Sequence, residues 1–328
     1  MRKILHLLLL ALTACGSREQ GQRLSIAVIP MGTTHEYWKS IHAGARKAAR
    51  EQGVEIIWKG PQKEDDRAQQ IALVEDMISR RVDGIVLAPL DGSGLQKPVS
   101  EARRAGIPSV IVDSGLQGED YLSFIATDNY KGGQLGARRL VEVLGGKGSI
   151  LLMRVMVGAQ STMRREQGFL DELRNHPAIR VLSDNQYGGI TTETAYQTGE
   201  NLLNRFPGVD GIFCPNESTT FGMLRALTDA GKAGRVKFVG FDSSEKLVAA
   251  LRQKHLHGLV LQNPFLMGEL GVQTLARHLR NRAAPIEKRI DTGVVVATPE
   301  NMDTPEIRLL LSPPIEKYLS RLLGQPAA

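Results

Sequence analysis

Cysteine is scarce in this chain, because its 328 residues contain only Cys15 and Cys214. Cys15 ends an apolar segment at the N-terminus, so the body of the chain holds Cys214 alone, without a partner for an intrachain disulfide. Cys214 directly follows the apolar residues Ile212 and Phe213. This setting indicates a buried structural thiol rather than a nucleophile.

Long hydrophobic runs are also missing. The apolar segment 4–11 follows Arg2 and Lys3. It is far shorter than the roughly 20 residues that span a bilayer, so it is typical of an export signal. Residues 12–15, Leu-Thr-Ala-Cys, resemble the lipobox of bacterial lipoproteins, which implies a signal peptide at 1–14, lipid attachment to Cys15 and a tether at 15–23. The alternative is ordinary signal cleavage, with Cys15 present by chance.

A strong excess of one charge is absent as well. The 41 basic and 35 acidic residues leave a formal charge of +6, and the basic residues are scattered along the chain. Nucleic-acid-binding proteins usually gather their basic residues on one face or stripe. The composition therefore gives no reason to expect a nucleic-acid partner.

Familiar catalytic motifs do not occur. There is no GxSxG elbow, and His35 is not followed by the second histidine of an HExxH site. The glycine cluster at 145–149 lacks the GK[ST] ending of a phosphate-binding loop, and Gly92 and Gly94 lack the third glycine of a dinucleotide fingerprint. We therefore predict no catalytic residue, no metal and no cofactor.

What the sequence does contain is a regular alternation of short apolar runs and helix-length segments. Strands are expected at 24–30, 54–59, 84–89, 109–113, 123–127, 149–154, 180–184, 211–215, 237–241 and 259–262. Helices are expected between them, at 36–51, 67–81, 93–104, 131–144, 162–174, 192–205, 219–230, 244–252 and 266–280. The alternation predicts an α/β fold with doubly wound parallel sheets. About ten strands are many for one open sheet, and the pattern restarts near 127–129, so two lobes are expected.

Polar side chains gather where the predicted strands end, which is where open α/β sheets bind ligands. Several of these residues carry planar or forked hydrogen-bonding groups that can address two neighbouring hydroxyls of a sugar. The strand ends and the nearby Arg165 supply His35, Tyr37, Trp38, Asp91, Asp113, Thr127, Asp128, Arg165, Tyr187, Asn216, Glu217, Asp242 and Gln262.

At this point the sequence resembles the class I periplasmic sugar-binding proteins, in particular the ribose-binding branch. The resemblance covers nearly all of the chain after the signal segment. Its most specific stretches, in order, are 124–129 with Gly132 and Gly133, 165–169, 215–217 leading to 224–227, 239–242 and 261–264.

The resemblance implies two lobes that close on a monosaccharide and deliver it to an ABC import permease. It places the lobes at 24–127 plus 263–291 and at 128–262 plus 292–312, joined by a hinge of three crossings, with a C-terminal helix or tail at 313–328. It further implies a non-enzymatic monomer, lipid-anchored in the cell envelope and facing the periplasm or exterior.

The resemblance also implies ligand contacts. Tyr37 and Trp38 match paired aromatic positions that flank the sugar ring, Phe241 matches an apolar contact, and Thr127 matches a serine-like position at the first crossing. Polar sugar contacts are implied for Asp113, Arg165, Asn216, Asp242 and Gln262. Tyr187 is added from its place at a strand end.

Three positions depart from the ribose branch. His35 and Ala88 each stand where that branch has an asparagine, and Ser114 stands where its aspartate is followed by an arginine. Ribose is therefore not singled out as the ligand, and a pyranose, another polyol or a sugar-like molecule fits equally well.

Other interpretations stay open. The binding lobes could serve a membrane sensor instead of a permease, or belong to a repressor, although a signal segment occupies the place of the DNA-binding helices. A hydrolase using Asp113 and Asp242 as an acid/base pair is a further alternative. Locally, Tyr37 lies on the buried stripe of its helix, the two aspartates and Asn216 could cap helices, and Arg165 could be solvated.

Overall fold

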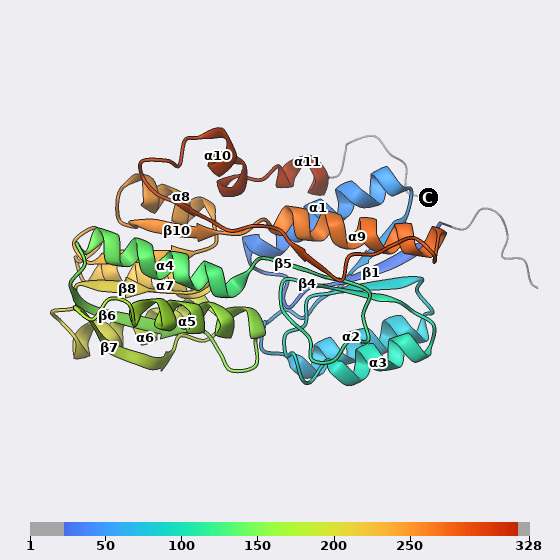
Figure 1. Cartoon of the computed structure of the whole chain (residues 1–328), viewed down its shortest axis with the longest axis horizontal. Coiled ribbons are helices and arrows are strands. Elements are labelled where there is room, and N and C mark those ends of the chain that lie inside the picture. The colour runs from blue at the N-terminus through green and yellow to red at the C-terminus, as the bar shows by residue number, and fades with distance from the viewer. Residues whose placement is uncertain (1–22, 321–328) are drawn as a thin grey trace, which may run out of the picture.

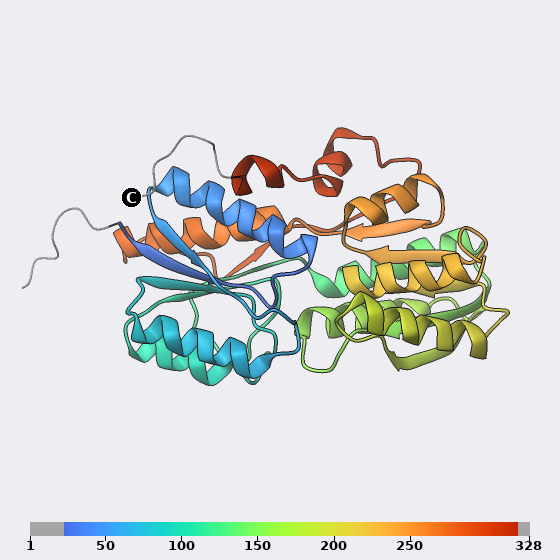
Figure 2. The same cartoon turned by 180° about the vertical axis from the view of Figure 1, so that it is seen from behind.

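The computed structural model describes residues 23–320. The expected signal segment, the lipid attachment at Cys15 and most of the tether lie outside these residues. Within them, no helix is both long and apolar enough to cross a membrane. The chain forms two α/β lobes that lie side by side (Figures 1 and 2). The predicted class, two lobes of doubly wound sheet, is confirmed.

The first lobe is built on a six-stranded, fully parallel sheet in the order β11-β5-β4-β3-β1-β2. Its apolar strands are covered on both faces, with α1 (Glu36–Gln52) and α9 (Pro264–Arg280) on one side and α2 (Arg67–Ser79) and α3 (Gln96–Arg104) on the other. The strands are β1 (Ser25–Ile29), β2 (Glu55–Trp58), β3 (Gly84–Leu87), β4 (Ser109–Val112), β5 (Phe124–Ala126) and β11 (Arg289–Asp291).

The second lobe repeats this plan with the order β12-β10-β9-β8-β6-β7. One face is covered by α4 (Asn129–Val143) and α5 (Gln160–Leu173), the other by α6 (Thr192–Arg205), α7 (Glu217–Asp229) and α8 (Glu245–Arg252). The strands are β6 (Gly148–Arg154), β7 (Ile179–Tyr187), β8 (Gly211–Phe213), β9 (Lys237–Phe241), β10 (Gly258–Leu261) and β12 (Val295–Ala297).

Two features of this sheet differ from the sequence prediction. The edge strand β7 continues to Tyr187 instead of ending at 184, and β12, which the sequence pattern did not predict, pairs antiparallel with β10. Edge strands have only one neighbour, so their length is less tightly set by the apolar pattern. The antiparallel strand is only three residues long and partly buried, although residues 294–297 are all apolar.

In each lobe two helices approach closely through a pair of glycines. A Cβ on Gly133 of α4 would lie 1.9 Å from the backbone oxygen of Arg165, and one on Gly168 of α5 would lie 2.0 Å from that of Tyr130. Gly44 and Gly268 make the same reciprocal contact between α1 and α9. These glycines fix α1, which carries Tyr37 in its first turn, and α5, which carries Arg165.

The chain passes between the two sheets after β5, after β10 and between β11 and β12. A further connection follows α10 (Pro305–Leu311), whose Ile307 packs into the second lobe. The last helix, α11 (Ile315–Leu319), lies instead beside α1, with the rings of Tyr318 and Phe265 5.6 Å apart. Residues 312–314 therefore form a strap from one lobe to the other, visible at the top of Figure 1.

Candidate functional site

A cavity between the lobes, called here the cleft cavity, brings together most of the polar strand ends. It is lined by Met31, His35, Tyr37, Trp38, Glu64 and Asp113 from the first lobe and by Val155, Met156, Ala159, Ser161, Thr162, Arg165, Asn216, Glu217, Asp242 and Gln262. The lobes touch across it, because Tyr37 N donates to Glu217 Oε2 (3.2 Å) and Ser161 N donates to Ser114 Oγ (3.2 Å). Only about 40 Å³ is free, so a ligand larger than a few waters requires the lobes to separate.

Two buried aromatic rings at the start of α1 form one wall. The Tyr37 hydroxyl donates to Asp113 Oδ1 (2.6 Å), and Trp38 Nε1 donates to Glu64 Oε1 (2.6 Å). The two rings meet edge to face with centroids 5.0 Å apart. No sugar ring fits between the two rings at that distance. The expectation that Tyr37 and Trp38 flank a bound sugar stays a prediction.

Both aspartates that follow central strands adopt the left-handed backbone conformation. Asp113 after β4 has a φ of 64° and Asp242 after β9 has a φ of 68°. Aspartate tolerates this region better than most residues, yet it remains uncommon and tends to occur at functional sites. Each lobe thus ends a strand in the same way at the cleft.

Arg165 is the central cation of the cleft and is only 2% exposed. Its Nε donates to Asn129 Oδ1 (2.7 Å) and its Nη1 to the carbonyl of Pro215 (3.0 Å), while Asp242 lies 3.9 Å away. The guanidinium stacks on the Phe241 ring at 4.0 Å. Its Nη2 has no hydrogen-bond partner among residues 23–320, which leaves a charged donor for a ligand.

Three acidic groups of the cleft, Asp113, Glu217 and Asp242, hold protons more tightly than usual. Burial raises the pKa of Asp113 to about 6, although Arg165 opposes this, and it raises the pKa of Glu217 to about 7. Burial likewise raises the pKa of Asp242, against the opposing charge of Arg165. Burial disfavours the charged form of His35, but the hydrogen bond and charge of Glu64 outweigh it and raise the His35 pKa to about 9.

Eight of the eleven predicted ligand residues line the cleft cavity: His35, Tyr37, Trp38, Asp113, Arg165, Asn216, Asp242 and Gln262. Asn216 also caps α7, because its Oδ1 accepts from Thr219 N (3.1 Å). The helix-cap interpretation of this residue therefore holds, and its contact with a ligand stays a prediction.

The other three predicted residues lie elsewhere. Thr127 is buried at the first crossing, where its hydroxyl donates to the carbonyl of Gly293 (3.0 Å). Phe241 is fully buried beneath Arg165 and supports that side chain. Tyr187 ends the edge strand β7, is 44% exposed and lines neither the cleft cavity nor the second cavity described below, so the strand-end rule was wrong for it.

Two acidic residues of the cleft were not among the predicted ligand contacts. Glu64 lies in the loop between β2 and α2, away from any strand end, and no local pattern marks it. Glu217 follows Asn216 at a predicted strand end and begins α7, where a glutamate is ordinary in the first turn of a helix. Its strand-end position was the signal that could have added it to the ligand contacts.

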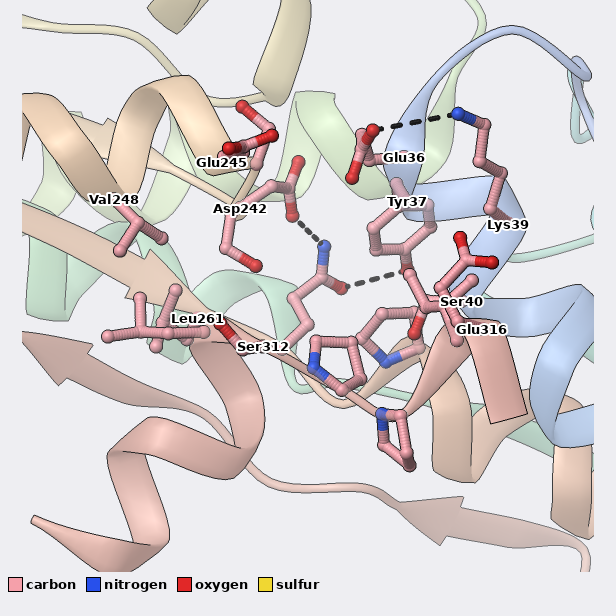
Figure 3. A pocket seen from close by; sticks show the side chains of 18 of the residues that line it. Glu36, Tyr37, Lys39, Ser40, Asp242, Glu245, Val248, Leu261, Ser312 and Glu316 are labelled. Atoms are coloured by element: carbon pink, nitrogen blue, oxygen red, sulfur yellow. Dashed lines mark hydrogen bonds and ion pairs between the residues drawn. The ribbon is translucent and has the colours of Figure 1, made fainter. Parts of the chain in front are cut away.

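A second cavity of about 380 Å³ lies beneath the strap and is lined by the start of α1, the loop between β9 and α8, and the strap itself (Figure 3). Tyr37, Gln262 and Asp242 line both cavities. They form a hydrogen-bonded partition, since Gln262 Nε2 donates to Asp242 (2.6 Å) and the Tyr37 hydroxyl lies 3.4 Å from Gln262 Oε1 (Figure 3). Although this cavity is the larger, Arg165 and Asp113 line only the cleft cavity, which therefore holds the groups suited to binding.

Comparisons with known proteins agree with this geometry. The family model of the periplasmic binding protein domain matches residues 26–283. The ribose import binding protein of Bacillus subtilis (strain 168) is 26% identical over 287 residues, which are 82% of this chain and 90% of the relative.

Two solved structures are similar as well. A periplasmic component of an ABC-type sugar transport system from Hahella chejuensis is 38% identical, with a TM-score of 0.80 over 84% of this chain and 99% of the other. An ABC transporter solute-binding protein from Agrobacterium vitis, with bound D-fucose, is 36% identical, with a TM-score of 0.84 over 88% of this chain and 100% of the other.

Proposed function

This chain belongs to the periplasmic binding protein domain family, among the class I sugar-binding proteins, and from that premise we propose that it binds a monosaccharide or sugar-like polyol between its lobes and delivers it to an ABC import permease. The relatives support the class of ligand, since one is a ribose import binding protein and another holds D-fucose. Because those two sugars differ, they do not single out one for this chain.

One observation carries the proposal: buried polar groups from both lobes line one cavity and retain unused hydrogen-bonding atoms. Arg165 Nη2 from the second lobe is an unused donor, and Asp113 Oδ2 from the first is an unused acceptor, among residues 23–320. A sugar hydroxyl both donates and accepts, so it can serve both groups. Each charge-assisted hydrogen bond contributes about 1.5–3 kcal/mol net.

The mechanism is a clamp. The first lobe, 24–127 plus 263–291, and the second, 128–262 plus 292–312, rotate about the three crossings between the sheets. A ligand stabilises the closed state only as far as it contacts both lobes. Asp113 contacts the ligand from the first lobe, and Arg165 with Asp242 contacts it from the second. A bound ligand therefore favours the closed state of the two lobes.

Similarity to ABC transporter binding proteins supports a permease as the membrane partner. The protein acts as a monomer in the periplasm or cell envelope, with Cys15 carrying the lipid anchor, and it presents its closed form to the permease. A Cys15→Ala variant should move from the membrane fraction to the soluble fraction, and retention on the membrane would contradict the anchor.

Isothermal titration calorimetry of the purified chain against pentoses, hexoses, polyols and nucleosides tests the proposal. We expect one or more monosaccharides or polyols to bind, with scattering showing a more compact particle in the presence of ligand. If none of these molecules binds, the proposed function is wrong.

A further inference from the structure

The cleft cavity carries more negative than positive charge. Four carboxylates line it, Glu64, Asp113, Glu217 and Asp242, against two cations, Arg165 and His35. With all four carboxylates ionised and His35 protonated, the formal charge is −2, and protonation of Asp113 or Glu217, whose pKa values are raised, makes it less negative. A neutral sugar does nothing to balance this excess.

Both cations of the cleft already lie beside a carboxylate. His35 Nδ1 lies 2.6 Å from Glu64 Oε1, and Arg165 lies 3.9 Å from Asp242. Asp113 has no cation within 4 Å among residues 23–320, but Arg165 is close enough to lower its pKa. For Glu217 the largest favourable charge is His35, which Glu64 already holds. Glu217 is therefore the carboxylate least well served by the protein.

Glu217 and Asp113 also accept few hydrogen bonds from the protein. Within the described residues, Glu217 accepts one bond, from Tyr37 N to Oε2, and its Oε1 accepts none. Asp113 is only 3% exposed and accepts one bond, on Oδ1, so its Oδ2 lacks a donor although the residue lines the cavity. Neither oxygen is fully buried, and both residues line the cavity, so hydrogen-bond donors on a ligand can reach them.

An ammonium group meets both needs, since it brings one positive charge and three donors. We infer that the ligand is an amino sugar or an amino-substituted polyol, with its ammonium group paired to Glu217 and its hydroxyls bound by Asp113 and Arg165. This inference rests on the proposed function and names the ligand class for the same cleft. It makes Glu217 a residue that determines specificity.

The change in protonation of Glu217 when a ligand binds provides a second measurement. Without ligand, Glu217 is half protonated near pH 7. His35, Glu64 and Asp242 face it from the loop before α1, the β2–α2 loop and the end of β9. An ammonium favours the ionised carboxylate, so its binding should release a proton at neutral pH. Asp113 can change its protonation when either kind of ligand binds. The difference in proton release between an amine and its matched hydroxyl ligand therefore reports on Glu217.

The test is calorimetry with matched ligands: D-glucose and D-glucosamine, D-galactose and D-galactosamine, sorbitol and glucamine, and the N-acetyl forms of the amines, which keep the nitrogen but lose its charge. We expect an amine to bind at least about tenfold more tightly than its hydroxyl partner, as a charged hydrogen bond implies. The preference should grow from about pH 5.5 to about pH 7.5, and buffers of different ionisation enthalpy should reveal proton release.

Glu217→Gln keeps the shape of the side chain and should abolish the preference for the amine, while binding of neutral sugar persists. Glu36→Gln is the matched control, because Glu36 lies one residue before Tyr37 and does not line the cleft cavity. The inference is overturned if hydroxyl ligands bind as tightly as their amines, and the assignment to Glu217 is overturned if Glu217→Gln keeps the preference. If neither neutral nor amino ligands bind, the proposed function itself fails.

Discussion

The contact of α4 with α5 offers the sharpest test of how the fold positions the binding cation. In Gly133→Ala the new Cβ would lie 1.9 Å from the Arg165 carbonyl oxygen and 2.8 Å from Phe169 N, whereas ordinary contacts begin near 3.4 Å. Both neighbours are backbone atoms, so no side chain can swing away. The helices must separate by about 1.5 Å at this point. Phe169 opposes this separation, because its ring is fully buried and stacked on the Phe213 ring, with the ring centroids 4.3 Å apart.

The size of the effect follows from opposing contributions. Overpacking of this kind costs roughly 3 kcal/mol at the upper end of the usual range, and alanine recovers about 1 kcal/mol over glycine within a helix. The net loss in free energy of unfolding is about 2 kcal/mol, which lowers the melting temperature by roughly 4–8 °C for a lobe of this size. Displacement of α5 also stretches the bond from Arg165 to Asn129, now 2.7 Å, so sugar affinity should fall at least about tenfold.

Thermal melting followed by calorimetry measures both effects on one preparation. Gly208→Ala is the control, since a Cβ there meets no heavy atom within 4 Å. If Gly133→Ala melts as high as Gly208→Ala and binds sugar equally well, the close approach of the helices does not exist as described.

Three further outcomes are expected. Arg165→Ala should weaken sugar binding by at least about 1.5 kcal/mol, whereas the neighbouring Arg164→Ala, exposed and stacked on a tyrosine, should bind normally; equal affinities would remove Arg165 from the site. The pKa of Glu217 in the folded protein is raised from 4.5 to about 7. Its contribution to the free energy of unfolding is therefore fully present below about pH 4.5 and is lost as the pH rises through about 7. The melting temperature of ligand-free Glu217→Gln should therefore decline less than that of the parent between about pH 5 and about pH 7.5, and parallel curves would contradict the raised pKa. Tyr187→Ala should leave affinity unchanged in calorimetry, and a marked loss would return this exposed residue to the site.

The strand-end residues show how much of the cleft the local sequence pattern can predict. Asp113 and Asp242 follow apolar runs that are buried on both faces, and the carboxyl ends of central parallel strands meet at one edge of a sheet. Their place in the cleft follows from that register alone. Tyr187 obeys the same rule in the sequence, but it ends an edge strand, where the side chain faces solvent instead of the other lobe.

The amino-acid sequence by itself determined the class of fold, the division into two repeated halves and the residues most suited to hold a sugar, because these depend on periodicity and on the chemistry of strand ends. Tertiary structure decided the charge of the cleft. Glu64 comes from a loop that carries no signal of its own, and Glu217, which follows a predicted strand end, shares a cavity with it only because the two lobes close over both residues. It also decided that Tyr37 and Trp38 touch edge to face, since the angle between two neighbouring rings depends on what each hydroxyl or ring nitrogen finds to bind.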